Sequence, residues 1–161
     1  MKHVIMALVQ NKPGVLAHVA GMFAARGFNI DSLVVGRTEE PGVSRMTIVA
    51  VGDDNVLEQI RKQLEKIVDV VKVRDFQEVS YVERDLMLLR VHAPAEKRPQ
   101  VVELVNLFRG RVVDVSRKSL IVELAGPEVK LEAFIDLVRP YGIGELARTG
   151  VIAMKRGKQA D

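Results

Sequence analysis

The chain has 161 residues, of which 48% are hydrophobic and 28% charged, a composition typical of a folded globular protein rather than a disordered one. It contains no cysteine, which excludes disulfides and thiolate metal sites and fits a reducing, cytoplasmic setting. The net charge is only +3, because 24 basic residues are interspersed with 21 acidic ones. This mixture of signs lacks the concentrated positive field that nucleic-acid binding requires. With five Phe, two Tyr and no Trp, the chain also lacks the aromatic residues on which bases stack.

The first half of the chain alternates between strand and helix patterns. Residues 4–9 form an apolar run that is too short to span a bilayer and is typical of a strand buried on both faces. Pro13-Gly14 then favours a helix start, and apolar residues recur at helical spacing until Arg26-Gly27. The pattern next predicts a hairpin whose two strands are residues 28–38 and 43–52. A helix capped by acidic residues follows at 56–67, and a final strand at 68–76.

This order of strand, helix, strand, strand, helix, strand predicts a ferredoxin-like domain, in which an antiparallel four-stranded sheet carries both helices on one face. We expect this domain over residues 1–76 and a linker over residues 77–83. The second half repeats the order of elements, which predicts a second βαββαβ domain over residues 84–161. Its last strand, from Gly142 to Met154, is expected to be interrupted at Gly144 or Gly150. The fold class is therefore α+β, with two ferredoxin-like domains.

No catalytic set is recognisable in the sequence. Catalysis requires a nucleophile beside a base, paired carboxylates or a metal cluster. His3, His18 and His92 have no further ligand residue at metal-binding spacing, and we interpret them as solvated or edge residues. The acidic residues near element ends are explained as helix caps and first-turn charges. The chain is therefore predicted to bind a ligand or a partner rather than to catalyse a reaction.

One junction carries the pattern of a small-molecule site. Gly14 follows a strand and opens a helix, where free N–H groups and a partial positive charge favour a carboxylate. Asn11 and Asn29 offer side-chain carbonyls to an ammonium group. Together with neighbouring aliphatic residues, they describe a site for a free aliphatic amino acid, with contacts from Asn11, Gly14, Val15, Leu16, Asn29 and Ile30. The same residues also suit a plain helix-start turn with Val15 and Leu16 in the core.

Several motifs resemble those of a known family. The strings NKPGVL at 11–16 and FAARGFNIDSL at 23–33 resemble the signature of ACT domains, which are amino-acid-sensing regulatory modules. The later strings SRMTI at 44–48, VERDLML at 82–88 and FRGRVVDV at 108–115 are similar to those of acetolactate synthase small regulatory subunits. The resemblance extends from Val4 to about Met154 and is looser after Lys118.

This resemblance implies a function. Members of the family are not enzymes by themselves; they activate a large catalytic subunit that uses thiamine diphosphate, Mg²⁺ and FAD, and they confer feedback inhibition, commonly by valine. Their effector lies between two ACT domains that pair side by side in a homodimer. By motif, one chain contributes Asn11, Gly14, Val15 and Leu16, and the other contributes Asn29 and Ile30. The second domain is implied to dock on the catalytic subunit.

Two alternatives remain open from the sequence. One is an ACT protein that regulates a different amino-acid enzyme or transcription. The other is a ferredoxin-like module that binds RNA, which would need aromatic residues exposed on its sheet. The identity of the branched-chain amino acid stays open as well, because one or two methylenes change affinity by only about 10–200-fold in an apolar pocket.

Overall fold

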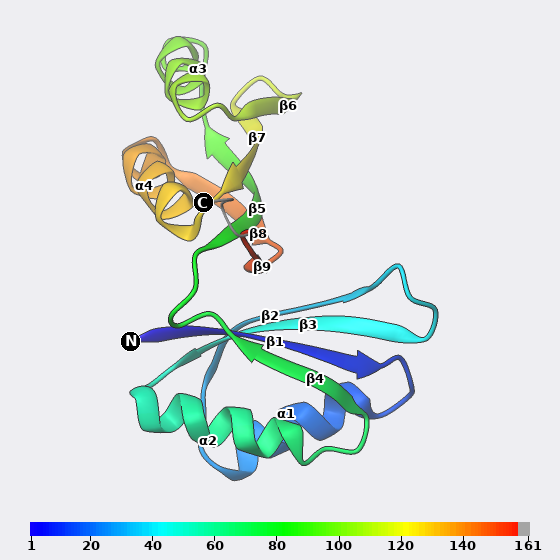
Figure 1. Ribbon diagram of the computed structural model, residues 1–161. Coiled ribbons are helices and arrows are strands. Elements are labelled where there is room, and N and C mark those ends of the chain that lie inside the picture. The colour runs from blue at the N-terminus through cyan, green and yellow to red at the C-terminus, as the bar shows by residue number, and fades with distance from the viewer. Residues whose placement is uncertain (158–161) are drawn as a thin grey trace. The chain divides into compact units, whose positions relative to one another are not determined.

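The computed structural model describes residues 1–157, and the chain divides into two compact units. The N-terminal unit comprises residues 1–82 together with the segment that begins at Val151, and the C-terminal unit comprises residues 83–150. In Figure 1 each unit is built on its own sheet, with helices packed against one face of it. Within residues 1–157, no helix is both long and apolar enough to cross a bilayer.

The N-terminal unit follows the predicted order of elements. Its four main strands form an antiparallel sheet in the order β2-β3-β1-β4, so that β2 and β4 are the edge strands. Both helices lie on the same side of this sheet (Figure 1). The elements are β1 (Lys2–Gln10), α1 (Val15–Ala25), β2 (Ile30–Arg37), β3 (Val43–Val51), α2 (Asp54–Glu65) and β4 (Val70–Asp75).

The core of this unit lies between the sheet and the two helices. Side chains alternate along a strand, so every second residue of β1 and β3 points toward the helices. Asp53 starts α2 as its cap, since its carboxylate accepts a hydrogen bond of 2.9 Å from the N–H of Val56. The buried residues include Ile5, Ala7, Val9, Val15, Val19, Phe23, Met46, Ile48, Ala50, Leu57, Ile60 and Leu64.

The C-terminal unit repeats this architecture. Its sheet has the order β6-β7-β5-β8, and its core includes Leu89, Val91, Val105, Val122, Leu124, Leu131 and Phe134. Its elements are β5 (Tyr81–His92), α3 (Arg98–Leu107), β6 (Arg111–Val115), β7 (Ser119–Gly126), α4 (Glu128–Val138), the short 3₁₀ helix η1 (Arg139–Tyr141) and β8 (Ile143–Arg148). The prediction of two ferredoxin-like domains is confirmed.

The end of the described chain returns to the N-terminal unit. After β8 the chain turns at Gly150, which has a φ of 89°, and forms the short strand β9 (Ile152–Lys155), which pairs with β5. Ala153 is buried against Met6 of β1 and Phe76, on the face of the sheet opposite α1 and α2. We call this face the second face. The returning segment therefore completes a small apolar cluster of the N-terminal unit.

These contacts differ from the expected boundaries in two places. The contacts group residues 151–157 with the N-terminal unit, whereas the sequence placed them in a domain spanning 84–161; residues 158–161 lie outside the described part of the chain. Strand β5 also begins at Tyr81, inside the expected linker 77–83, because its first residues pair with β9, and beside them the N–H of Arg156 donates a 2.9 Å hydrogen bond to the carbonyl of Ser80. The expected break in the last strand is confirmed and lies at Gly150.

Candidate functional site

The junction of β1 and α1 exposes backbone donors at a helix start. Gly14 precedes α1 with a φ of 87°, a left-handed conformation that glycine adopts without strain. The N–H of Val15 lies 3.5 Å from the carbonyl of Lys12, and the N–H groups of Leu16 and Ala17 have no acceptor within residues 1–157. No side chain of the described residues caps this helix. The tip is therefore open to an anionic group from outside.

Open space surrounds the same tip. A Cβ added at Gly14 would meet no heavy atom within 4 Å, so a ligand can approach the backbone closely. Asn11 lies just before the tip, is exposed, and is anchored by a 2.8 Å hydrogen bond from its backbone N–H to the carbonyl of Gly42. In the part of the chain that the structure describes, the Asn11 side chain makes no hydrogen bond. Its amide oxygen is thus available to accept from an ammonium group.

The two aliphatic residues after Gly14 have different roles. Val15 is buried in the core of the N-terminal unit, so it can offer a ligand only its backbone N–H. Leu16 is 46% exposed beside the helix tip and can provide an apolar contact. Sequence periodicity placed both residues on the apolar stripe of the helix. The structure separates them, since only Leu16 faces away from the sheet.

The strand register places the second half of the predicted site at the opposite end of the sheet. Strand β2 begins at Ile30 beside Ala50 of β3, and Ala50 in turn pairs with His3 near the start of β1. Strand β1 ends at Gln10, which pairs with Val43 at the other end of β3. With about 3.3 Å per residue, the two ends of β2 are roughly 20 Å apart.

Within one chain the predicted residues therefore form two separate groups. Asn11, Gly14 and Leu16 lie at the end of β1, whereas Asn29 and Ile30 lie at the start of β2. Asn29 is exposed, and its side chain makes no hydrogen bond to any of residues 1–157. Neither group alone provides both a carboxylate site and two ammonium acceptors.

Strand β2 is an edge strand with exposed apolar surface. It pairs with β3 on one side only. Val35 pairs with the buried Met46, so it lies on the helix-facing side of the sheet, yet it is 43% exposed. A strand whose outer edge is unpaired and whose apolar side chains are exposed is a template for pairing with another strand.

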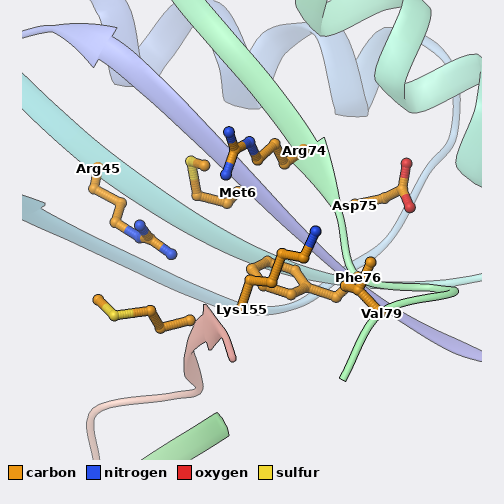
Figure 2. Close-up of a pocket in the computed structure, with 8 residues that line it drawn as sticks. Met6, Arg45, Arg74, Asp75, Phe76, Val79 and Lys155 are labelled. Atoms are coloured by element: carbon orange, nitrogen blue, oxygen red, sulfur yellow. The ribbon is translucent and has the colours of Figure 1, made fainter. Parts of the chain in front are cut away.

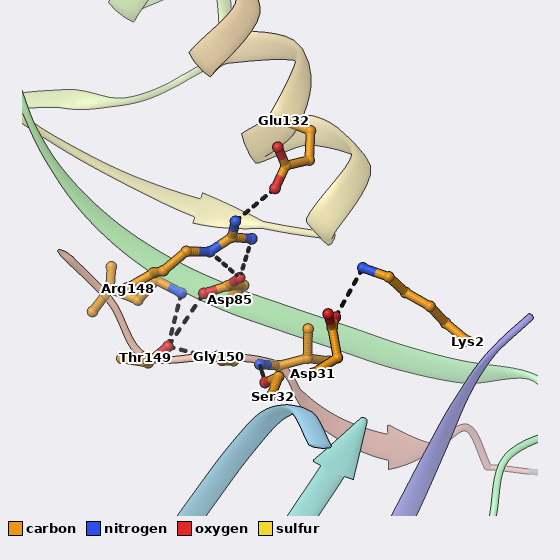
Figure 3. Close-up of polar contacts among 10 residues, drawn as sticks. Lys2, Asp31, Ser32, Asp85, Glu132, Arg148, Thr149 and Gly150 are labelled. Carbon is orange, nitrogen blue, oxygen red and sulfur yellow. Dashed lines mark hydrogen bonds and ion pairs between the residues drawn. The ribbon is translucent and has the colours of Figure 1, made fainter. Parts of the chain in front are cut away.

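Polar contacts fix the start of β2 in ways that the sequence did not indicate. Lys2 Nζ lies 3.0 Å from the carboxylate of Asp31, and the Ser32 hydroxyl accepts a 3.1 Å hydrogen bond from the N–H of Val151 (Figure 3). The returning segment of the chain thus contacts β2, the strand that follows Asn29. This contact could not be predicted from the sequence, because Ser32 and Val151 are far apart along the chain and meet only in the folded structure.

Other polar groups have structural roles. His3, near the start of β1, is buried and its Nε2 lies 3.0 Å from the carbonyl of Gly52; of our two alternatives, a solvated or an edge residue, the solvated one was wrong. His18 and His92 are exposed, as expected. Among residues 1–157, no three His, Asp or Glu side chains are grouped so that they could hold a metal ion.

Comparison with known proteins assigns the class of each half of the chain. Residues 5–72 match the family described as "AHAS small subunit-like ACT domain", and residues 84–157 match the family described as "Small subunit of acetolactate synthase". The N-terminal unit, with its open helix tip and edge strand, is therefore an ACT domain.

Full-length relatives define the family more closely. A protein of Archaeoglobus fulgidus named "Probable acetolactate synthase small subunit" is 62% identical over 159 residues, covering 99% of each chain. The acetolactate synthase small subunit of Mycolicibacterium smegmatis is 50% identical over 96% of this chain and 91% of its own length. The crystal structure of the small subunit from Thermotoga maritima matches with a TM-score of 0.90 and 45% identity, covering 99% of both chains. The chain belongs to the family of acetolactate synthase small subunits.

Proposed function

We propose that this chain is a non-catalytic regulatory subunit of acetolactate synthase that acts in the cytoplasm. It binds the large catalytic subunit, raises its activity and makes it sensitive to a branched-chain amino acid, with valine as the expected effector. Thiamine diphosphate, Mg²⁺ and FAD belong to the catalytic partner, and this chain binds none of them. Membership of the small-subunit family supports the partner, and the geometry of the N-terminal unit supports the effector site.

The observation that carries the effector site is the separation of its two halves. Asn11 and Gly14 lie at one end of the sheet, and Asn29 lies at the other. Suppose that two copies pair through their β2 edges with the two β2 strands antiparallel. The first residue of β2 in one copy then lies beside the last residue of β2 in the other copy. That arrangement brings Asn29 of one copy toward the helix tip of the other. A homodimer paired in this way has two complete sites.

The chemistry of such a site matches a free aliphatic amino acid. The ligand's carboxylate accepts hydrogen bonds from the N–H groups that follow Gly14 and gains from the partial positive charge of the helix start. Its ammonium group donates to the amide oxygens of Asn11 and Asn29. Leu16 and Ile30 then contact the aliphatic side chain. Each group of the ligand has a distinct partner, and the partners come from two copies.

Regulation follows from the position of this site between copies. A ligand that contacts both copies stabilises the packing in which all its contacts are made, and only such a difference in affinity shifts an equilibrium between states. A coupling free energy of about 1–3 kcal/mol to the catalytic subunit would be typical. In this proposal the C-terminal unit docks on the catalytic subunit, so the ligand acts on the enzyme through the dimer.

Co-purification with the catalytic subunit tests the partner. The full chain is expected to remain bound to that subunit through affinity purification, to increase acetolactate formation, and to make that activity decrease as valine is added. Failure to bind the catalytic subunit would overturn the assignment of the partner. Binding and activation without any response to valine, leucine or isoleucine would overturn the effector site while leaving the partner in place.

A pair of substitutions at Gly14 tests the site itself. Asn and Asp both tolerate positive φ better than other side chains, and the open space at Gly14 accommodates either of them. Gly14→Asp adds a carboxylate that repels that of the ligand, whereas Gly14→Asn has almost the same shape without the charge. By titration calorimetry, valine should bind the Asp variant at least about tenfold more weakly than the Asn variant, or ~1.4 kcal/mol. Equal affinities would rule out the carboxylate position.

A further inference from the structure

A cavity of about 380 Å³ opens on the second face of the N-terminal sheet. Met6, Phe76 and Val79 provide an apolar wall (Figure 2). Met154 of the returning strand β9 also lines the cavity. Cavities of this size accommodate small molecules. The cavity lies on the opposite side of the sheet from α1, so it is distinct from the effector site proposed above.

Three cationic side chains line this cavity. Strand pairing brings two of them together. Arg45 of β3 pairs with Leu8 of β1, and Arg74 of β4 pairs with Met6 of β1. Met6 and Leu8 are two residues apart and so lie on the same face of β1, and both arginines line the cavity. Lys155 comes from β9. In Figure 2 the guanidinium groups of Arg45 and Arg74 face the same hollow as the Lys155 side chain.

Among residues 1–157, few negative groups compensate the positive charges in the cavity. In the described part of the chain, the single acidic residue in the lining is Asp75, whose carboxylate extends away from the arginines (Figure 2). This carboxylate lies 3.4 Å from the N–H of Gln77. Arg45 donates a hydrogen bond to the carbonyl of Ala153, which is uncharged. Within residues 1–157, Arg74 and Lys155 have no ion pair.

Electrostatics within the cavity also favour the binding of an anion. Burial lowers the pKa of the Arg45 guanidinium, and the charge of Arg74 lowers it further. Arg74 is exposed and Arg45 is partly buried, and two like charges near each other repel unless an anion lies between them. Arginine side chains present planar forks that match carboxylate and phosphate oxygens. The unfavourable arrangement is therefore relieved when an oxyanion enters.

We propose that this cavity binds a small organic oxyanion with two negative charges, held by Arg45, Arg74 and Lys155 and seated on the apolar wall of Met6 and Phe76. A phosphate monoester and a dicarboxylate share this chemistry. Arg45 donates a hydrogen bond to Ala153 of the returning segment, and Lys155 is part of that segment. An anion bound to both side chains therefore links the returning segment to the sheet. Anion binding should therefore stabilise the N-terminal unit against unfolding.

Titration calorimetry on the full chain, at constant ionic strength with chloride as the balancing anion, tests this site. The probes are phenyl phosphate, succinate and inorganic phosphate. We expect saturable binding of at least one organic dianion. Arg74→Gln and Lys155→Gln should each weaken it by about tenfold or more, because a charge-assisted hydrogen bond is lost. Lys72→Gln is the matched control, since Lys72 lies on the same strand and face as Arg74 but does not line the cavity.

The outcomes separate the two kinds of ligand. Tighter binding of phenyl phosphate assigns a phosphate ester, and tighter binding of succinate assigns a dicarboxylate; both uphold the proposal. The melting temperature of Arg74→Gln without ligand should equal or exceed that of the parent chain, because a repulsion is removed. No saturable binding of any probe, or an equal loss of affinity in Lys72→Gln, would overturn the proposal.

Discussion

The carboxylate of Asp85 is buried beneath the guanidinium of Arg148. Asp85 has a side chain only 1% exposed, and its Oδ2 accepts hydrogen bonds of 2.9 Å from Nε and 2.5 Å from Nη2 of Arg148 (Figure 3). Arg148 also pairs with Glu132 through Nη1 at 2.6 Å. Burial lowers the pKa of Arg148, but hydrogen bonds with Glu132 and Asp85 raise it by more, so its pKa is above the usual value. This network links β5, β8 and α4 of the C-terminal unit.

Removing the arginine from this network should destabilise the C-terminal unit. Arg148→Met retains the aliphatic stem but leaves the Asp85 carboxylate buried, and among residues 1–157 its remaining polar contact is the Thr149 hydroxyl at 3.4 Å. We expect a loss of about 3 kcal/mol in the free energy of unfolding, since a buried charge without its partner is costly. Urea titration followed by circular dichroism measures this loss.

Two further variants provide the controls for Arg148. Glu132→Gln removes only the exposed partner and should cost no more than about 1 kcal/mol. The double variant Asp85→Asn with Arg148→Met should recover part of the stability, because the buried charge is then absent. A loss of similar size in all three variants would contradict the role given to the Asp85 charge.

A charge on the β2 edge should separate the proposed homodimer. Val35 of β2 is 43% exposed and would be covered by the partner, so Val35→Asp would bury a carboxylate in the interface. Sedimentation velocity should show the dimer dissociation constant rising by at least about tenfold, or ~1.4 kcal/mol. Val71→Asp is the control, because Val71 is a 62% exposed residue of the other edge strand, β4. Equal effects of both variants would contradict pairing through β2.

Two glycine-to-alanine substitutions should change stability in opposite directions. A Cβ at Gly52 would lie 2.6 Å from Cγ1 of Val56 and 2.7 Å from its Cβ, so Gly52→Ala should destabilise the chain by about 1–3 kcal/mol. Gly21 is inside α1 and has open space around it. Gly21→Ala should stabilise by about 0.5–1 kcal/mol, because alanine favours the helix. Thermal unfolding of both variants tests the signs.

Neighbouring residues of β9 should respond differently to a charge. Ala153 is 4% exposed in the apolar cluster with Met6 and Phe76, whereas Ile152 is 52% exposed. Ala153→Asp should cost about 2–4 kcal/mol and increase amide hydrogen exchange in β1 and β4. Ile152→Asp should change stability by less than about 0.5 kcal/mol. If hydrogen exchange in β1 stayed unchanged in the Ala153 variant, the returning segment would not stabilise the N-terminal sheet.

Local patterns in the sequence predicted the order of elements because those patterns are short-range. The apolar run at residues 4–9 and the helical spacing after Gly14 need no knowledge of distant residues. The open helix tip was predictable for the same reason, since Pro13-Gly14 dictates the backbone there. The edge position of β2, by contrast, follows from the order of the strands in the sheet, which one strand's own pattern does not specify.

Features that depend on pairing between distant segments were not predictable. Arg45 and Arg74 meet only because both of their strands pair with β1 in one particular register. The burial of Asp85 beneath Arg148 likewise requires the β5–β8 pairing. The return of Ala153 to Met6 has no local signature, because an alternating strand pattern does not specify which sheet it will cover. Long-range register, rather than local preference, determines these features.

The return of the chain to its first unit has a consequence for biosynthesis. Met6 and Phe76 leave the ribosome early, but the segment that covers them is translated only after residues 83–150. At roughly 5–20 residues per second, that interval lasts on the order of 3–14 s. A nascent chain therefore carries an uncovered apolar patch while its second unit is still being made, and premature termination before Val151 would leave that patch accessible to chaperones and proteases.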